Sequence, residues 1–203
     1  MSTATAEMDP VALRLLDATI STIDEHGEVG VRVQDVVKDA GVQIPVLYRH
    51  FGNREGLVQA AQLERLRRDL DDEMSAVSEM LGGATTAGDF RSVFDAVLER
   101  ICSPDRRLPR SRRVNVLGST YGRPDLAAGV AAQQRVTIDR VAELLDRPAS
   151  HGWLRGGLDT RVFATWFGGV MIGRIVADLD LESVDMDAYD QMWLDAVRHV
   201  LFG

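Results

Sequence analysis

Apolar side chains recur at intervals of three and four residues along almost the whole chain, and this periodicity limits the fold more than any other feature. No alternation of apolar and polar residues typical of strands continues beyond about five residues. The run from Phe90 to Ile101 is typical, because its apolar residues fall on one wide helical face. With 203 residues, 45% of them apolar, the chain can bury a sizeable core. The sequence therefore predicts an all-α fold.

Glycine, proline and capping residues predict where these helices begin and end. We expect helices over residues 10–26, 33–40, 44–50, 54–81, 89–103, 114–120, 124–147, 160–179 and 187–202. The stretch from Ser103 to Arg113 is rich in proline and arginine, and we expect it to be a connecting loop. The first three helices are too short to bury much core by themselves, so they should depend on packing against the long fourth helix.

Several features point to a cytoplasmic protein. The most apolar stretch, Val162 to Gly173, is shorter than the roughly 18 residues needed to span a bilayer, and we expect no membrane segment. Residues Met1 to Met8 lack the basic start and apolar run of a signal peptide. The single cysteine, Cys102, indicates a reducing compartment without disulfides.

The charge distribution gives two opposing indications about nucleic acid. The net charge is −8 and the excess of acidic residues lies in the N-terminal half, whereas a nucleic-acid binder normally carries a basic surface. The segment from Arg32 to Arg54 is an exception, because its local net charge is positive. Its basic residues are Arg32, Lys38, Arg49 and Arg54, and its acidic residues are Asp35 and Asp39. The two short helices of this segment, joined through Gly41, predict a helix-turn-helix whose second helix can enter a major groove.

The same segment resembles a known family. Val36 to Leu57 reads VVKDAGVQIPVLYRHFGNREGL and resembles the N-terminal signature of the tetracycline-repressor (TetR) family of bacterial transcription regulators. The resemblance is specific at residues 40–42, 47–51 and 53–57. We expect a disordered tail over residues 1–8, a DNA-binding domain over 9–52, and an effector-binding and dimerisation domain over 53–203.

The resemblance implies roles for residues of the helix-turn-helix. Tyr48 and His50 would contact DNA phosphates, and Arg54 would hold the DNA backbone at the start of the fourth helix. Base reading would come from the exposed side of the third helix, with Arg49 pairing with guanine and Val46 contacting a thymine methyl. The other expected base-reading residues are Gln43 and Ile44.

Three positions depart from the pattern usual in the family. Arg32 and Gln43 stand where hydroxyl residues usually begin the second and third helices, and Ile44 stands where basic or small residues are frequent. Each lost hydroxyl cap removes a contact worth about 1 kcal/mol. The charge of Arg32 offers a replacement phosphate contact.

The resemblance makes the rest of the chain an effector-binding domain. The candidate pocket residues are Phe94, Leu98, Cys102, Leu117, Tyr121 and Trp166. Cys102 is either a small buried apolar residue or a sensor thiol, and we favour the first. The arginines between Arg106 and Arg113 either bind an anionic ligand or lie in water, and a solvated loop is favoured.

The last two helices carry more aromatic and methionine residues than one covered chain needs. A helix that is apolar on all sides must be buried on all sides, and a second subunit is a natural cover. In the family these helices form a four-helix dimer interface. The candidate interface residues are Phe163, Phe167, Met171, Tyr189, Trp193 and Val197. The alternative is that the two helices only close the core of the monomer.

No spacing typical of a metal site, a phosphate loop, a dinucleotide fold or a catalytic serine occurs, so we expect no enzyme, metal or cofactor. We expect a homodimeric repressor that is released from a pseudo-palindromic DNA operator by a small-molecule effector. The alternative is a small-molecule-binding protein with a degenerate DNA-binding head, suggested by the acidic N-terminal half and by Arg32, Gln43 and Ile44.

Overall fold

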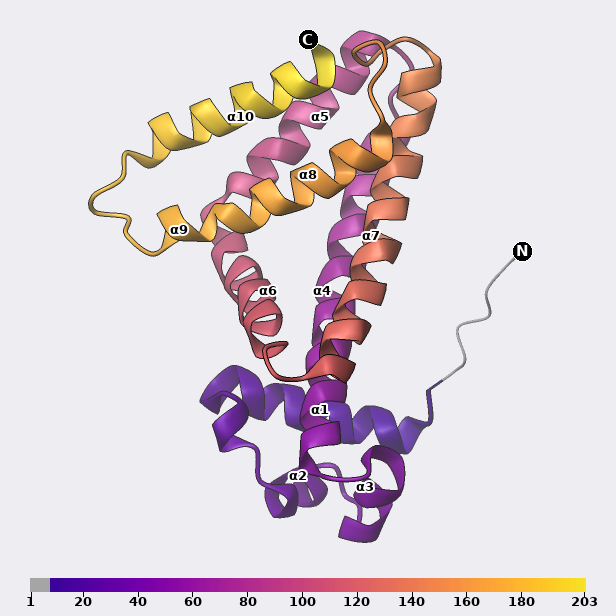
Figure 1. The fold of residues 1–203 in the computed structure, drawn as a ribbon, viewed down its shortest axis with the longest axis vertical. Helices are drawn as coiled ribbons and strands as arrows, with labels where there is room; N and C mark the ends of the chain where they lie inside the picture. Colours follow the sequence, from indigo (N-terminus) through magenta and orange to yellow (C-terminus); the bar gives the residue numbers. More distant parts are fainter. Residues whose placement is uncertain (1–7) are drawn as a thin grey trace. The chain divides into compact units, whose positions relative to one another are not determined.

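The computed structural model describes residues 8–203 as helices joined by short turns, and this confirms the predicted all-α fold (Figure 1). The helices are α1 Pro10–His26, α2 Val33–Asp39, α3 Ile44–Phe51, α4 Arg54–Gly82, α5 Ala87–Cys102, α6 Arg107–Ser119, α7 Pro124–Ser150, α8 Thr160–Gly173, α9 Ile175–Asp178 and α10 Met186–Phe202. Two 3₁₀ turns, Glu28–Gly30 and Pro104–Arg106, lie between them. Apart from Met8, the expected disordered tail lies outside the described residues.

The chain divides into two compact units, an N-terminal unit up to Arg67 and a C-terminal unit from Arg68 to Gly203. The boundary lies inside α4, whereas the sequence suggested a boundary between residues 52 and 53. The physical reason is the packing of α4, because Leu57, Val58 and Ala61 are buried in the core of the N-terminal unit. The expected dependence of the short helices on the fourth helix is therefore confirmed.

The capping residues act as the sequence predicts. Asp9 precedes α1 and its Oδ1 accepts a hydrogen bond of 2.8 Å from the backbone N–H of Val11. The side chain of Asn53 accepts one of 2.8 Å from the backbone N–H of Gly56 at the start of α4. Helix α5 begins two residues before the predicted start, because Thr86 and Asp89 form a capping box.

The loop predicted between Ser103 and Arg113 is wrong, since most of this stretch is helical. Pro104 begins a 3₁₀ turn, and Pro109 lies in the first turn of α6. Proline is tolerated there because the first N–H groups of a helix have no partner within that helix. The two prolines therefore help to begin helices here instead of interrupting one.

The single helix predicted over residues 160–179 is also wrong, because the structure divides it at Arg174 into α8 and α9. The Arg174 guanidinium is buried, donates to the carbonyl of Cys102 at 3.0 Å, and pairs with Asp190. These contacts draw Arg174 into the core of the unit. A buried cation needs such partners, and none of them lies on the same helix.

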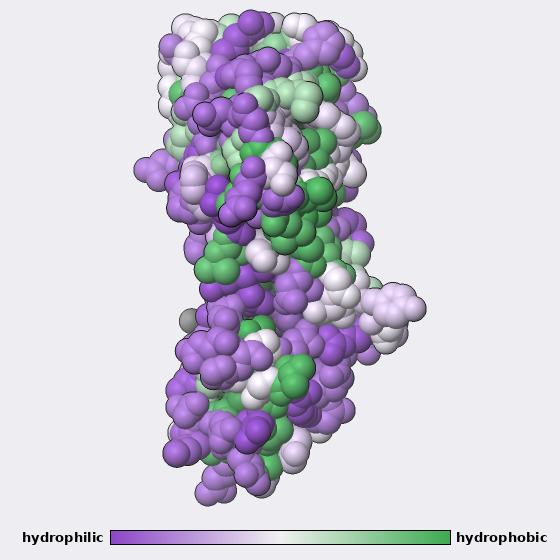
Figure 2. Space-filling model, turned by 90° about the vertical axis from the view of Figure 1, so that its left-hand side faces the viewer, coloured by the Kyte–Doolittle hydropathy of each residue, from purple (hydrophilic) through white to green (hydrophobic). Residues whose placement is uncertain are grey.

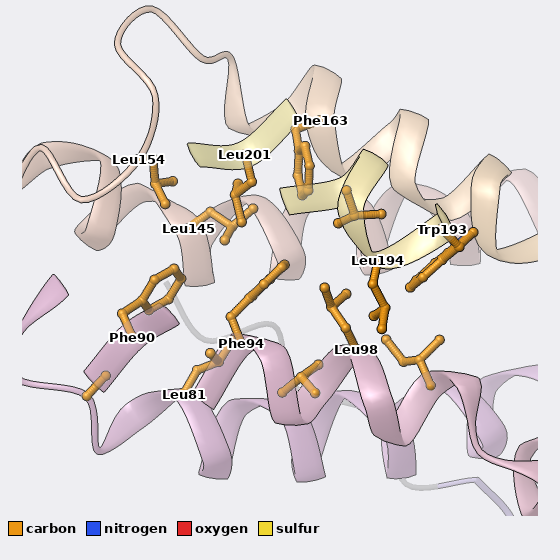
Figure 3. Close-up of a cluster of buried hydrophobic side chains, with 14 of the residues drawn as sticks. Leu81, Phe90, Phe94, Leu98, Leu145, Leu154, Phe163, Trp193, Leu194 and Leu201 are labelled. Atoms are coloured by element: carbon orange, nitrogen blue, oxygen red, sulfur yellow. The ribbon is translucent and has the colours of Figure 1, made fainter. Parts of the chain in front are cut away.

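The C-terminal unit has one main apolar core, in which α5 packs against α10 and α7 packs against α8. Phe90, Phe94 and Leu98 point from α5 toward Leu201 and Leu194 of α10 (Figure 3). The ring of Phe94 lies edge-on to that of Phe202, with 5.9 Å between the centroids. This packing holds four separate helices around a common apolar interior.

Gly56 gives a first testable prediction, because a Cβ atom at this position would lie 2.2 Å from the carbonyl oxygen of Phe51. The substitution Gly56→Ala is expected to destabilise the N-terminal unit by about 1–3 kcal/mol, since the backbone must shift to make room. Hydrogen exchange of peptides from residues 8–67 measures this loss. In Gly118→Ala the added Cβ meets no atom within 4 Å, and this control should stabilise α6 by up to about 1 kcal/mol. Equal effects of the two substitutions would contradict the close approach at Gly56.

Candidate nucleic-acid interface and ligand cavity

Helices α2 and α3 form the predicted helix-turn-helix. Gly41 supplies the turn with φ of +66°, a conformation that other residues adopt only with strain. The turn is closed by a 2.9 Å hydrogen bond from the backbone N–H of Val42 to the carbonyl of Val37. Leu47 on α3 and Val36 on α2 are buried in the core, so the opposite side of α3 is left open to solvent.

Most residues that the resemblance assigns to DNA contact lie on this open side. Arg32, Gln43, Ile44, Tyr48 and Arg49 are exposed, and Val46 is partly buried. Neither Arg32 nor Gln43 makes a capping hydrogen bond with its side chain, as expected from the missing hydroxyl groups. Tyr48 is 46% exposed, which leaves its ring accessible to a partner.

Three cations are available on this surface. Arg32, Lys38 and Arg49 are exposed and make no side-chain hydrogen bond or ion pair with any described residue of the chain. An exposed guanidinium or ammonium without an internal partner can meet a phosphate at little cost in lost contacts. The overall acidity of the protein therefore does not extend to the open side of the helix-turn-helix.

His50 and Arg54 are held by contacts within the N-terminal unit. His50 is partly buried, and its Nε2 lies 3.7 Å from Asp9 at the start of α1. The Arg54 guanidinium donates to the carbonyls of Val31, at 2.8 Å, and of Glu28. Arg54 therefore anchors the first turn of α4 to the turn before α2, a structural function that the sequence did not indicate.

A polar network inside the N-terminal unit was also missed by sequence reasoning. Gln62 on α4 donates to the carboxylate of Glu28 at 2.7 Å, and Arg65 pairs with Asp24 of α1 at 2.8 Å. Gln62 and Arg65 are buried and are themselves hydrogen-bonded at 3.1 Å. The only signal in the sequence is their spacing of three residues, which places them on one face of α4.

The C-terminal unit contains a cavity of about 280 Å³. Its walls come from α4, α5, α6, α7 and α8 and are largely apolar. Six of the lining residues belong to the apolar core, and Figure 3 labels four of them: Leu81, Phe94, Leu145 and Phe163. The polar lining residues are Glu73, Arg113, Gln134, Thr137 and Thr165. An apolar cavity with a few polar groups is typical of a small-molecule site.

The structure brings one of the six candidate pocket residues, Phe94, to the described lining of this cavity. Leu98 is buried in the core where α5 packs against α10, and Cys102 follows it one turn later near Arg174. Tyr121 is 96% exposed in the turn before α7, and Trp166 is on the outer side of α8. Leu117 is partly buried on α6, away from the cavity lining. Helical periodicity identified the apolar side chains but not the neighbours that each one faces.

The arginine cluster between Arg106 and Arg113 is paired inside the protein instead of lying in a solvated loop. Arg110 is buried and donates to both carboxylate oxygens of Asp178, at 2.7 and 3.0 Å, and to the carbonyl of Ile101. Arg106 lies 3.4 Å from Glu73. Arg113 differs from these because it lines the cavity. The favoured expectation of a solvated loop is therefore wrong.

Cys102 is buried, and this burial raises the pKa of its thiol from the ordinary 9.0 to about 11, while the charge of Arg174 opposes the shift. The thiol therefore loses its proton at lower pH in the unfolded chain, and its contribution to stability falls as the pH rises from 9 to 11. At pH 8 we expect iodoacetamide to react about a hundredfold more slowly with the folded protein than with the urea-unfolded chain. The rates are measured by mass spectrometry, with Cys102→Ala as the blank. Equal rates would contradict the buried thiol.

The candidate interface residues divide between the core and the cavity. Phe163, Trp193 and Val197 are buried in the core of their own chain, and Tyr189 is partly buried. Phe167 and Met171 line the cavity. The physical reason is that α8 and α10 turn their aromatic sides toward α5 and α7. The exposed apolar residues on these two helices are Val162, Trp166 and Met192.

The helices and ionisable side chains of residues 8–203 bear on membrane insertion and on metal binding. No helix in that range is both long and apolar enough to cross a bilayer. No group of three or more histidine, cysteine, aspartate or glutamate side chains is placed there to hold a metal ion.

Comparison with known proteins places the N-terminal residues in a regulator family. The family model described as "Bacterial regulatory proteins, tetR family" matches residues 15–61. The HTH-type transcriptional regulator BetI of Brucella canis is 34% identical over 146 residues, which are 70% of this chain and 63% of that protein, just under two thirds of its length. BetI 1 of Chromohalobacter salexigens is 29% identical over 199 residues, covering 96% of this chain and 92% of that protein.

Solved structures share the fold over nearly the whole chain. A tetR-family transcriptional regulator from Rhodococcus sp. superposes with a TM-score of 0.69 at 23% identity, covering 94% of this chain and 98% of that one. FadR from Bacillus subtilis, in complex with stearoyl-CoA, superposes with a TM-score of 0.60 at 16% identity, and the match covers 91% of this chain and 96% of FadR. A regulator from Saccharomonospora viridis, in complex with choline, superposes with a TM-score of 0.67 at 18% identity, and the match covers 95% of this chain and 97% of that regulator.

Proposed function

The chain belongs to the tetR family of bacterial transcriptional regulators, and from this we propose that it is a cytoplasmic repressor released from a pseudo-palindromic operator by a small-molecule effector. The observation that carries this proposal is the open side of the helix-turn-helix. It offers Arg32, Lys38 and Arg49 without internal side-chain partners in the described chain, together with the exposed ring of Tyr48.

The proposed DNA contacts follow from how these side chains are held. Arg49 reads a guanine from α3, while Arg32 and Tyr48 contact phosphates. Gln43, Ile44 and Val46 complete the base-reading side. His50 and Arg54 contribute through position, because Asp9 and the carbonyls of Glu28 and Val31 already engage them.

The cavity in the C-terminal unit is the proposed effector site. Its walls are largely apolar, and its volume of about 280 Å³ is close to the lower end of the range of about 300–1,000 Å³ for ligand sites. Stearoyl-CoA and choline are bound by two proteins of this fold, which supports a small molecule as effector without indicating its chemistry.

Helix α4 offers a path for coupling between effector and DNA, since it runs without interruption from Arg54 to Gly82. Leu57, Val58 and Ala61 belong to the core of the N-terminal unit, whereas Met74 and Val77 line the cavity. We propose that the effector favours a tilt of α4 that widens the spacing of the DNA-binding units in a dimer. A preference of about 1–3 kcal/mol is sufficient for regulation.

A homodimer is proposed through the outer sides of α8 and α10. Val162 and Trp166 form an exposed stripe on α8 with Gly169, which also belongs to the cavity lining, and Met192 is 67% exposed on α10. Figure 2 shows hydrophobic surface of the C-terminal unit among polar areas. Apolar side chains beside a glycine allow two helices to approach closely across a two-fold axis.

Light scattering at several protein concentrations tests the dimer. A dimer of the wild type that becomes a monomer in Met192→Glu supports it. The matched control is Val136→Glu, which places the same charge on an exposed apolar position of α7. A monomeric wild type, or a dimer that survives Met192→Glu, would contradict this interface.

Selection of random DNA fragments by the purified protein tests the function. We expect enrichment of a pseudo-palindrome whose half-sites are about 34 Å apart, with binding that weakens as salt rises. The comparison variant is Tyr48→Ala with Arg49→Ala, both exposed positions. Arg54 is left unchanged, because its substitution would remove backbone contacts as well as charge.

The two outcomes separate the proposal from its rival. A palindrome enriched by the wild type and lost in the double variant supports the regulator. No enrichment even at low salt would contradict it and favour a small-molecule-binding protein with a degenerate DNA-binding head. In that case ligand binding in the cavity would continue without any effect of DNA.

A further inference from the structure

Arg113 is the unusual feature of the cavity, because it is a cation in a largely apolar space that forms no ion pair with any residue between 8 and 203. Its neighbours in the cluster are paired: Arg110 with Asp178, Arg106 with Glu73, and Arg112 at 3.9 Å from Asp69. Arg113 makes no side-chain hydrogen bond or salt bridge with any residue in the described chain. The protein therefore holds one guanidinium in the cavity wall without an internal counterion in contact.

The electrostatics of the cavity favour an anion. Burial lowers the pKa of Arg113, and the more distant Glu73 carboxylate opposes this shift. Glu73 is the single acidic residue in the described lining, and Arg106 already lies 3.4 Å from it. Arg106, Arg113 and Glu73 together carry a net charge of one positive unit. A bound anion would remove the cost of leaving the guanidinium without a partner.

Four of the five polar lining residues lie on α4, α6 and α7, and the fifth, Thr165, lies on α8. Arg106 and Glu73 join the start of α6 to α4, and Arg140 pairs with Asp71 at 2.6 Å, which joins α4 to α7. Gln134 and Thr137 line the cavity on the turns of α7 before Arg140. The Gln134 amide is thus a hydrogen-bond donor in the cavity lining, whereas the Thr137 hydroxyl already donates to the carbonyl of Gln133 at 3.1 Å.

The other part of the cavity is apolar. Leu81, Phe94, Leu145 and Phe163 line it, and Figure 3 shows their side chains directed into the interior between α5 and the helices opposite. From Glu73 to Leu81 is eight residues of α4, which is about 12 Å at the helical rise of about 1.5 Å per residue. An extended alkyl chain of about ten carbons has a similar length, since each C–C bond of about 1.52 Å advances the zigzag chain by about 1.3 Å.

We propose that this cavity binds an amphipathic monoanion, a carboxylate of medium chain length, with its head group paired to Arg113 and its alkyl chain between Phe94 and Phe163. The inference rests on the proposed function, since it specifies the chemistry of the effector. It does not require the operator to be known, because binding at this site is measured directly.

Titration calorimetry with three ligands of the same chain length tests the head group. The probes are decanoate, decanol and decyltrimethylammonium, each with the purified full chain. Decanoate is expected to bind the wild type at least about tenfold more tightly than decanol, a difference of about 1.4 kcal/mol. The cation is expected to bind less tightly than decanol, because it would meet the charge of Arg113.

Variants identify the residue that recognises the head group. Arg113→Met keeps the apolar stem of the side chain. It should lower the affinity for decanoate at least about tenfold and leave the affinity for decanol nearly unchanged. Arg112→Met removes the same charge one residue earlier, outside the described lining, and should bind decanoate as the wild type does. Glu73→Gln removes the opposing carboxylate and should tighten decanoate binding, so the proposal remains testable if Arg113→Met does not fold.

Three results would overturn the proposal: tightest binding of the cation, no binding of any probe, or equal affinity of wild type and Arg113→Met for decanoate. The proposed function can fail separately. If decanoate binds in the expected way but does not weaken operator binding, the site is retained and the regulation is wrong. If another molecule releases the operator while decanoate does not bind, the regulation is retained and the ligand class is wrong.

Discussion

Replacing Asp178 with asparagine is expected to lower the free energy of unfolding of the C-terminal unit by about 3–5 kcal/mol. Both side chains of the ion pair are buried, with 4% of Asp178 and 8% of Arg110 exposed. Two hydrogen bonds of 2.7 and 3.0 Å join them, so asparagine leaves a buried guanidinium without its counterion. Urea unfolding followed by tryptophan fluorescence measures the loss, because Trp153, Trp166 and Trp193 all belong to this unit.

A matched control uses the same substitution in an exposed pair. Asp95 lies 2.8 Å from Arg198, but 37% and 31% of these side chains are exposed. Asp95→Asn is therefore expected to cost less than about 1 kcal/mol. Replacing Arg110 and Asp178 together with methionine and leucine should recover most of the stability. If Asp178→Asn costs no more than Asp95→Asn, the pair is not desolvated in solution.

Replacing Arg49 with alanine is expected to weaken operator binding by about 1–3 kcal/mol per half-site. The reason is the loss of the proposed bidentate contact with guanine, because Arg49 is exposed and has no side-chain partner in the described chain. Specificity should relax at one base position of each half-site. Fluorescence anisotropy with the selected operator, and with single-base variants of it, measures both effects.

Two variants serve as comparisons for Arg49→Ala. Arg135→Ala removes an exposed arginine of α7 in the C-terminal unit and should leave operator affinity unchanged. Arg32→Ala should weaken binding to all DNA sequences similarly, and it should reduce the salt dependence of DNA binding by about one released counterion. If Arg49→Ala also weakened every sequence equally, Arg49 would contact a phosphate and the base-reading function would be wrong.

The start of the chain shows how far local rules reach. Asp9 and Asn53 cap the helices that the sequence predicts, and Gly41 occupies the left-handed turn between α2 and α3. These features depend on neighbours within a few residues, so the sequence contains all the information they need.

Predictions that needed a distant partner were less successful. Arg110 looked solvated because its counterion, Asp178, lies 68 residues away in the chain. Nothing in the sequence indicated that the carbonyls of Glu28 and Val31 hold the guanidinium of Arg54, whose contact with DNA stays a prediction. A charged side chain looks the same in a sequence whether its partner is water, a phosphate or a buried group. The choice between them is made by tertiary packing.

The all-helical fold and the helix-turn-helix follow from the sequence, because helix periodicity, caps and turn residues act over short distances. Which apolar residues line the cavity and which close the core is set by tertiary packing. Phe94 and Leu98 lie four residues apart on α5, but one lines the cavity and the other packs in the core beside it. That difference depends on how α5 is oriented against α7, α8 and α10, and many orientations are compatible with the same apolar stripe.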